Sequence, residues 1–446
     1  MIKNTLVLVF CLFQSLAIFS QNRIEGKLEN SSDFTYALLY KVNGTERKFI
    51  ANKNLINGSF RFDLAENLPA GVYRVVFDYR AGVYLDVYYN TKESISFTLD
   101  PSNPDFTVSF TSSVENKIFY EFFQEKSLAQ IDLDQAQVDF LSDASKANSE
   151  SYKTNRKELI AIQNAALQNS VGLYVAPFII ANIRNNPKDP VSNGLEYLQY
   201  VKDHYFDNLD FRDKTVLNSD YFYTKISDYV FYLSRSQDPA NQSELYKEAI
   251  GLTLRQDSSQ EFKANVTEML IKQFKQFEDL EMVNFLMNNY YEKFPIALQN
   301  QDFIKDTRLA LSTAVGNIAP DFNWKKEGVE TSLFEELGTN STILVFWSSS
   351  CGHCLKEIPE LYKNTAGDSS IQVIAVGMEE ESEDWDQMIQ SMPKWKHVLA
   401  LEKWENPIAR SYNIIGTPTY FVLDNRAMII QKPKDLGVLN QWLENQ

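Results

Sequence analysis

Cysteine and histidine are both scarce in this sequence, which has three of each among 446 residues. A structural zinc site needs about four such ligands, and only Cys351 and Cys354 form a close pair. We therefore expect no metal site, and no motif calls for another cofactor. His204 stands alone among polar residues and is assigned to the surface or to a helix cap, and His397 is assigned no role.

Basic residues are too few for a nucleic-acid-binding protein. The chain has 59 acidic against 43 basic residues and a net charge of −16, whereas a phosphate-binding surface requires the opposite balance. Long apolar runs are missing as well, because no segment after the N-terminus approaches the ~20 residues of a membrane-spanning helix. The composition, 44% hydrophobic and 13% aromatic, still supports sizeable cores, which excludes a disordered chain.

The N-terminus has the features of a secretion signal. Lys3 supplies positive charge, Leu6 to Phe19 is largely apolar, and small Ser20 precedes polar residues. This pattern predicts a cleaved signal peptide at residues 1–20 and export to the periplasm or cell envelope. A lipid-modified cysteine normally follows a small residue, but Phe10 precedes Cys11, so we place Cys11 in the discarded segment.

Changes in residue pattern divide the remaining chain into three expected domains. Residues 21–112 alternate in the β manner and predict an antiparallel β sandwich or barrel. Residues 113–316 have helical periodicity and predict an all-α region. Residues 317–446 alternate strands with helices and predict an α/β layer architecture.

Individual segments carry these patterns. Predicted strands in the β domain are Phe60–Leu64, Val72–Phe77, Val83–Tyr89, Ile95–Leu99 and Phe106–Phe110. Predicted helices in the helical domain are Tyr152–Asn169, Leu195–Phe206, Tyr221–Ser234, Ser243–Arg255 and Phe262–Tyr291. In the last domain we predict strands Ile343–Trp347, Val373–Val376 and Tyr420–Leu423, and helices Leu355–Asn364, Asp384–Ser391 and Gly437–Asn445.

Cys351-Gly352-His353-Cys354 follows a predicted buried strand and opens a predicted helix. The helix N-terminus favours a thiolate at Cys351, and Cys354 lies one turn further on, where it can resolve a mixed disulfide. A purely structural disulfide would close a very short loop and stabilise little. Covalent haem attachment requires histidine directly after the second cysteine, where Leu355 stands.

Four matched elements give residues 317–446 a resemblance to the exported thioredoxin-like proteins of the TlpA/ResA type. The elements are Ala319–Phe322, Phe346-Trp347, Lys356–Pro359 and Ile415–Phe421, in the family's order. The resemblance implies a thioredoxin-like fold and a redox-active disulfide between Cys351 and Cys354. The preceding β and helical parts resemble a recurrent architecture of exported bacterial proteins, which suggests that they position or select a partner.

The resemblance also implies roles for individual residues. Pro418 would form a cis peptide that holds the Thr417 backbone beside Cys351 for pairing with a substrate strand. Thr417 and Trp347 are assigned to substrate binding. Glu357 matches an acidic residue beneath the cysteines and would accept the proton of Cys354, although a solvated helix charge is an equal alternative. Val345 replaces the buried aspartate of ordinary thioredoxins, which leaves Glu357 as the only apparent local acid.

Two departures from the family concern the direction of electron flow. Ser350 replaces a common tryptophan, and His353 stands where the family commonly has proline. Histidine beside the thiolate stabilises the reduced form and makes the disulfide more oxidising. We expect a thiol–disulfide oxidoreductase that reduces protein disulfides, with protein substrates and an unidentified redox partner. The alternatives are an oxidase or isomerase, and a partner-binding protein with a regulatory redox module.

Overall fold

The computed structural model describes residues 22–30, 32–236, 238–326, 328–338 and 340–445. The predicted signal peptide, residues 1–20, lies outside them. The chain forms two compact units, the first ending at Leu270 and the second beginning at Ile271. Within the described ranges, no helix combines the length and the apolar character needed to cross a membrane.

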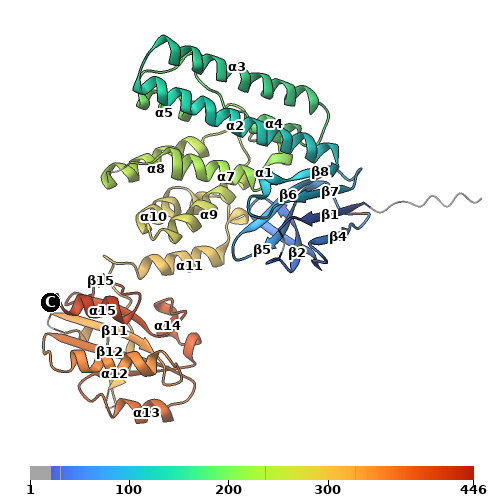
Figure 1. Cartoon of the computed structure of the whole chain (residues 1–446). Coiled ribbons are helices and arrows are strands. Elements are labelled where there is room, and N and C mark those ends of the chain that lie inside the picture. Colours follow the sequence, from blue (N-terminus) through green and yellow to red (C-terminus); the bar gives the residue numbers. More distant parts are fainter. Residues whose placement is uncertain (1–21, 31, 237, 327, 339, 446) are drawn as a thin grey trace, which may run out of the picture. The chain divides into compact units, whose positions relative to one another are not determined.

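Two four-stranded sheets build the N-terminal part of the first unit (Figure 1). Their strand orders are β4-β1-β7-β8 and β3-β2-β5-β6. The strands are β1 (Arg23–Leu28), β2 (Tyr36–Asn43), β3 (Glu46–Asn54), β4 (Ser59–Asp63), β5 (Gly71–Asp78), β6 (Val83–Tyr89), β7 (Ile95–Leu99) and β8 (Ser109–Ser112). The predicted β domain is confirmed, but β1 and β7 pair in parallel, so the first sheet is mixed rather than purely antiparallel.

Period-two alternation explains which side chains of the β4-β1-β7-β8 sheet are buried in the core. Phe60 and Phe62 of β4 are buried while the residues between and beside them are exposed. Gly26 of β1 pairs with both Phe60 and Phe97, and a Cβ there would lie 2.7 Å from the Phe60 ring and 2.8 Å from the Phe97 ring. Glycine therefore lets the two rings close over β1.

The strand predicted at Phe106–Phe110 is wrong in its first half. Residues Pro104–Thr107 form a short helix, α1, and strand β8 begins only at Ser109. Proline is favoured in the first turn of a helix, and the Thr107 hydroxyl donates to the Asn103 carbonyl at 2.8 Å. These local effects override the alternating pattern.

Helices form the remainder of the first unit and the start of the second. They are α2 (Val114–Ser142), α3 (Lys146–Asn169), α4 (Ala176–Ala181), α5 (Gly194–Asp203), α6 (Lys214–Leu217), α7 (Tyr221–Ser227), α8 (Pro239–Leu254), α9 (Gln260–Gln276), α10 (Leu280–Asn289) and α11 (Gln301–Ser312), with a π-helical segment at Asp228–Leu233 and 3₁₀ turns at Tyr291–Lys293 and Ile296–Leu298. The helix predicted at Phe262–Tyr291 is in fact two, because the chain turns at Glu278, whose φ is +58°. The helical region itself is confirmed.

A five-stranded sheet with order β13-β12-β11-β14-β15 forms the centre of the second unit's C-terminal part (Figure 1). Its elements are β11 (Ser341–Trp347), α12 (Cys354–Thr365), β12 (Ile371–Glu379), α13 (Glu383–Ile389), β13 (Lys396–Leu401), α14 (Pro407–Ser411), β14 (Thr419–Asp424), β15 (Ile429–Gln431) and α15 (Leu436–Leu443). A β-hairpin of β9 (Asn323–Lys326) and β10 (Val329–Ser332) precedes them, and 3₁₀ turns occur at Phe334–Glu336 and Lys403–Glu405.

Helices cover both faces of this sheet, which gives the predicted α/β layers. Side chains of α12, α13 and α15 pack on one face, in a cluster that contains Cys354 and Trp347. Residues of α14 and the segment around Phe322 pack on the other face. The predicted central strand, β11, is buried along its whole length, because it has neighbours on both sides and layers on both faces.

Candidate active site

Two free thiols lie where β11 gives way to α12. Residues 348–350 form the connecting loop, Cys351 precedes the helix, and Cys354 is its first residue. Cys351 is partly exposed, whereas the side chain of Cys354 is fully buried. The Cys354 N–H donates to Cys351 Sγ at 3.4 Å, so the first sulfur lies at the helix N-terminus, where anions are stabilised.

The two thiols differ in acidity. Partial burial raises the pKa of Cys351, but hydrogen bonding with Cys354, with Thr417 and with the backbone of His353 outweighs burial, so this pKa lies below its ordinary value. Burial and the neighbouring Cys351 raise the pKa of Cys354 to about 12. Because the thiolate is the attacking species, Cys351 is the better nucleophile and Cys354 needs help to lose its proton.

The loop before β14 brings Thr417 and Pro418 to the dithiol. The Thr417–Pro418 peptide bond is cis, and the Cys351 thiol donates to the Thr417 carbonyl at 3.3 Å. Ile415, in the same loop, has 90% of its surface exposed. The Thr417 backbone therefore lies beside the nucleophile, in a loop that also exposes an apolar side chain.

Glu357 is half-buried on the first turns of α12. The Tyr420 hydroxyl donates to Glu357 Oε2 at 2.8 Å, and the Tyr420 ring belongs to the buried cluster that holds Cys354. This arrangement differs from a solvated helix charge, and it supplies a carboxylate on the same helix turn as the resolving cysteine.

Glu379 is a second local acid, so the expectation that Glu357 stands alone is wrong. It ends β12 and has only 3% of its surface exposed. Its carboxylate accepts hydrogen bonds from the backbone of Ser349 and from the Ser348 and Ser349 hydroxyls. Glu379 lies far from the motif in sequence, and the available signal was its position three residues after Val376, where the predicted neighbouring strand ends.

Two other predicted site residues have contrasting positions. Trp347 has no exposed surface, so the prediction that its side chain binds substrate is wrong, and it supports the site from within the core. His353 is exposed at the N-cap position of α12. His204 caps α5 and contacts Asp207. Among the described residues no cluster of three metal-ligating side chains occurs.

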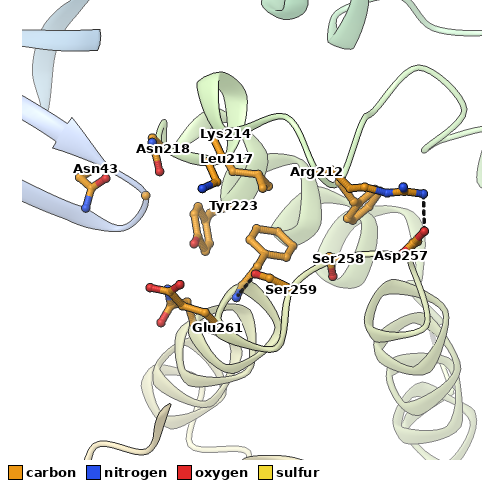
Figure 2. A pocket seen from close by; sticks show the side chains of 14 residues that line it. Asn43, Arg212, Lys214, Leu217, Asn218, Tyr223, Asp257, Ser258, Ser259 and Glu261 are labelled. Carbon is orange, nitrogen blue, oxygen red and sulfur yellow. Dashed lines mark hydrogen bonds and ion pairs between the residues drawn. The ribbon is translucent and has the colours of Figure 1, made fainter. Parts of the chain in front are cut away.

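The first unit contains a separate cavity of about 640 Å³. Figure 2 shows Asn43, at the turn between β2 and β3, across from Tyr223 and Glu261 on α7 and α9. Arg212 and Asp257, which also line it, pair with each other. The lining combines polar side chains with apolar ones such as Phe211, Leu217 and Phe262, and no sequence pattern predicted this cavity.

A family model described as "Thioredoxin-like" matches residues 338–429. The thioredoxin-like protein YneN of Bacillus subtilis is 26% identical over 117 residues, which are 26% of this chain and 68% of that protein. Among solved structures, the thioredoxin domain of a thiol-disulfide oxidoreductase from Bacteroides vulgatus is 26% identical, with a TM-score of 0.27, and covers 30% of this chain and 96% of its own. A domain of a possible thiol-disulfide isomerase from Cytophaga hutchinsonii is 33% identical, with a TM-score of 0.25, and covers 30% of this chain and 92% of its own.

The matched residues coincide with the five-stranded sheet and the dithiol. The C-terminal part of the chain is therefore a thioredoxin-like domain. Its paired thiols at a helix N-terminus place it in the class of thiol–disulfide oxidoreductases.

Proposed function

We propose that this protein is an exported oxidoreductase of the TlpA/ResA type that reduces disulfides in other proteins of the periplasm. The observation that carries the proposal is the asymmetry of the dithiol. Cys351 is accessible and has a lowered pKa, whereas Cys354 is buried and has a pKa of about 12. Cys351 therefore suits the role of the attacking thiol, and Cys354 suits the role of the resolving thiol.

The reaction has two exchange steps. Cys351 thiolate attacks one sulfur of a substrate disulfide, forms a mixed disulfide, and expels the other substrate sulfur as a thiolate that takes up a proton. Cys354 then passes its proton to Glu357 and attacks Cys351 Sγ, which releases the second substrate thiolate. The substrate gains two electrons, the Cys351–Cys354 disulfide forms, and a thiol-bearing redox partner restores the dithiol.

Substrate selection depends on the loop around the cis proline. The backbone of Thr417 pairs with an extended substrate segment, as in strand addition, and this holds the substrate disulfide beside Cys351. Exposed Ile415 adds an apolar contact at the same edge. Protein segments, rather than a small thiol, fit this combination of backbone edge and apolar surface.

Trapping of covalent adducts tests the proposal. The full-length Cys354→Ser variant, expressed with its export signal, should accumulate mixed disulfides with several proteins, because Cys351 attacks and no resolving thiol follows. The matched Cys351→Ser variant should trap none. If Cys351→Ser traps the substrates, the two roles are reversed; adducts dominated by one non-protein thiol would contradict protein substrates.

A disulfide isomerase or oxidase is the second candidate function. The observation in its favour is His353, whose backbone contributes to the lowered pKa of Cys351 and whose exposed imidazole can stabilise the reduced form. Insulin reduction assayed beside refolding of a scrambled-disulfide substrate separates the two, since an isomerase would restore the native pairing while a reductase would leave free thiols.

A further inference from the structure

Glu379 is a buried acid that takes no part in the two exchange steps described above. Its Oε1 accepts from the Ser349 N–H at 2.6 Å. Its Oε2 accepts from the Ser349 hydroxyl at 2.9 Å and from the Ser348 hydroxyl at 3.2 Å. A buried carboxylate is costly unless it is hydrogen-bonded, and here both oxygens bind one short loop.

Strand register explains why Glu379 faces that loop. β11 and β12 run in parallel, and Trp347 pairs with Gly377. Two residues further along each strand direction, Ser349 and Glu379 come to the same end of the sheet. Backbone pairing between β11 and β12 ends at Trp347 and Gly377. Beyond that point, the Glu379 side chain holds the two segments together by its hydrogen bonds to Ser349.

The loop in turn holds the nucleophile. The Cys351 N–H donates to the Ser348 carbonyl at 3.2 Å. The Ser348 hydroxyl accepts from the Ser350 N–H at 3.3 Å and contacts the Ser350 hydroxyl at 3.0 Å. Three successive serines have no apolar side chain to anchor them, and the Glu379 carboxylate accepts hydrogen bonds from two of them, Ser348 and Ser349.

We propose that Glu379 is a positioning residue that fixes the Ser348–Ser350 loop and thereby sets the reactivity of Cys351. It touches neither substrate nor the reacting sulfurs, and it acts through hydrogen bonds to the loop. The proposal deepens the proposed function and depends on Cys351 being the attacking thiol.

The test measures the alkylation rate of Cys351 by iodoacetamide across pH in the reduced full-length protein. Glu379→Ala should slow alkylation at neutral pH roughly tenfold, because the loop loses three hydrogen bonds to the Glu379 side chain. Glu379→Gln should slow it less, since the amide oxygen still accepts from the Ser349 N–H. Glu380→Ala, which removes the exposed neighbouring carboxylate, should react like the wild type.

A folded Glu379→Ala protein that is alkylated as fast as the wild type, or faster, would overturn the proposal. If Glu379→Ala does not fold, Ser349→Ala replaces it, because this variant keeps the carboxylate and removes one hydroxyl donor. An unchanged alkylation rate of Cys351 in Ser349→Ala would also overturn the proposal. Alkylation requires no protein substrate, so failure of the trapping experiment and failure of this one remain distinguishable.

Discussion

The Tyr420 hydroxyl lies 2.8 Å from Glu357 Oε2, and its ring packs in the same buried cluster as Cys354. The phenol stays protonated, because burial and the bond to Glu357 raise the pKa of Tyr420. It therefore acts as a donor that fixes the Glu357 carboxylate in one orientation. The contact therefore orients the carboxylate that we propose as the proton acceptor for Cys354.

Glu357→Gln should change the pH dependence of mixed-disulfide release. Burial raises the pKa of Cys354 above its ordinary value, so only a small fraction of this thiol is ionised at neutral pH. Without a proton acceptor, release should depend on that rare thiolate and accelerate about tenfold per pH unit. The wild type should show a shallower rise. Single-turnover release followed by rapid acid quench measures both profiles.

Two controls accompany this experiment. Glu360→Gln changes an exposed glutamate on the same helix and should leave the profile unchanged, whereas Tyr420→Phe should give an intermediate profile because the carboxylate loses its orienting donor. If Glu357→Gln keeps the wild-type profile, Glu357 has no part in proton transfer.

Selective alkylation should separate the two thiols. At neutral pH one equivalent of iodoacetamide should modify Cys351, whose pKa is lowered, and leave Cys354, which is buried and has a pKa of about 12. Raising the pH through the lowered pKa of Cys351 increases its thiolate fraction, so its rate should rise and then level off. Peptide mapping by mass spectrometry measures both sites, and prior modification of Cys354 in the folded protein would contradict the assignment.

Arg74→Met should strongly destabilise the first unit. The Arg74 guanidinium, whose side chain is 2% exposed, binds Asp86 and Asp220 with N–O distances of 2.6 Å. Its removal leaves Asp86 without its counter-charge and leaves Asp220 with only Arg47, whose guanidinium nitrogen lies 3.8 Å away. Breaking a buried pair in this way costs roughly 3–5 kcal/mol. Denaturant unfolding measures the change in free energy.

The exposed pair of Arg61 and Asp63 provides the comparison. Arg61→Met should cost no more than about 1 kcal/mol, as is usual for surface ion pairs. Equal costs for Arg74→Met and Arg61→Met would show that the buried network contributes no more than a surface pair.

Local patterns predicted the redox centre well because its parts are contiguous. The apolar run before Ser348 and the helix after Cys354 are both local signals, and β11 and α12 appear where they were expected. The strands from Phe60 to Leu99 and most of the helices followed in the same way from their periodicities, whereas the strand at Phe106–Phe110 and the single helix at Phe262–Tyr291 did not. The parallel pairing of β1 with β7 did not follow either, since it joins segments about 70 residues apart whose register no local signal specifies.

Features that depend on register or on backbone conformation escaped prediction. Glu379 lies beside Ser349 only because β11 and β12 pair as they do, and the strand had been expected to end at Val376. The helix break at Glu278 has neither glycine nor proline to announce it. Trp347 is assigned to substrate binding through the family resemblance, but β11 is covered on both faces, so all its side chains, including Trp347, are buried.

His353→Pro should lower the reduction potential of the dithiol. The His353 backbone N–H lowers the pKa of Cys351 and so favours the thiolate of the reduced form. Proline has neither this N–H nor an imidazole, so the substitution favours the disulfide and makes the pair more reducing. For this two-electron couple, a single interaction of about 1.4 kcal/mol shifts the potential by ~30 mV.

We expect the reduction potential of the wild type to lie between the values typical of thioredoxin and of protein disulfide isomerase, roughly −270 to −180 mV. Equilibration with glutathione measures the potential, and His204→Ala, a histidine of the other unit that pairs with Asp207, should leave it unchanged. A wild-type potential near the roughly −120 mV of DsbA would rule out the reductase direction, and an unshifted His353→Pro variant would remove the role assigned to His353.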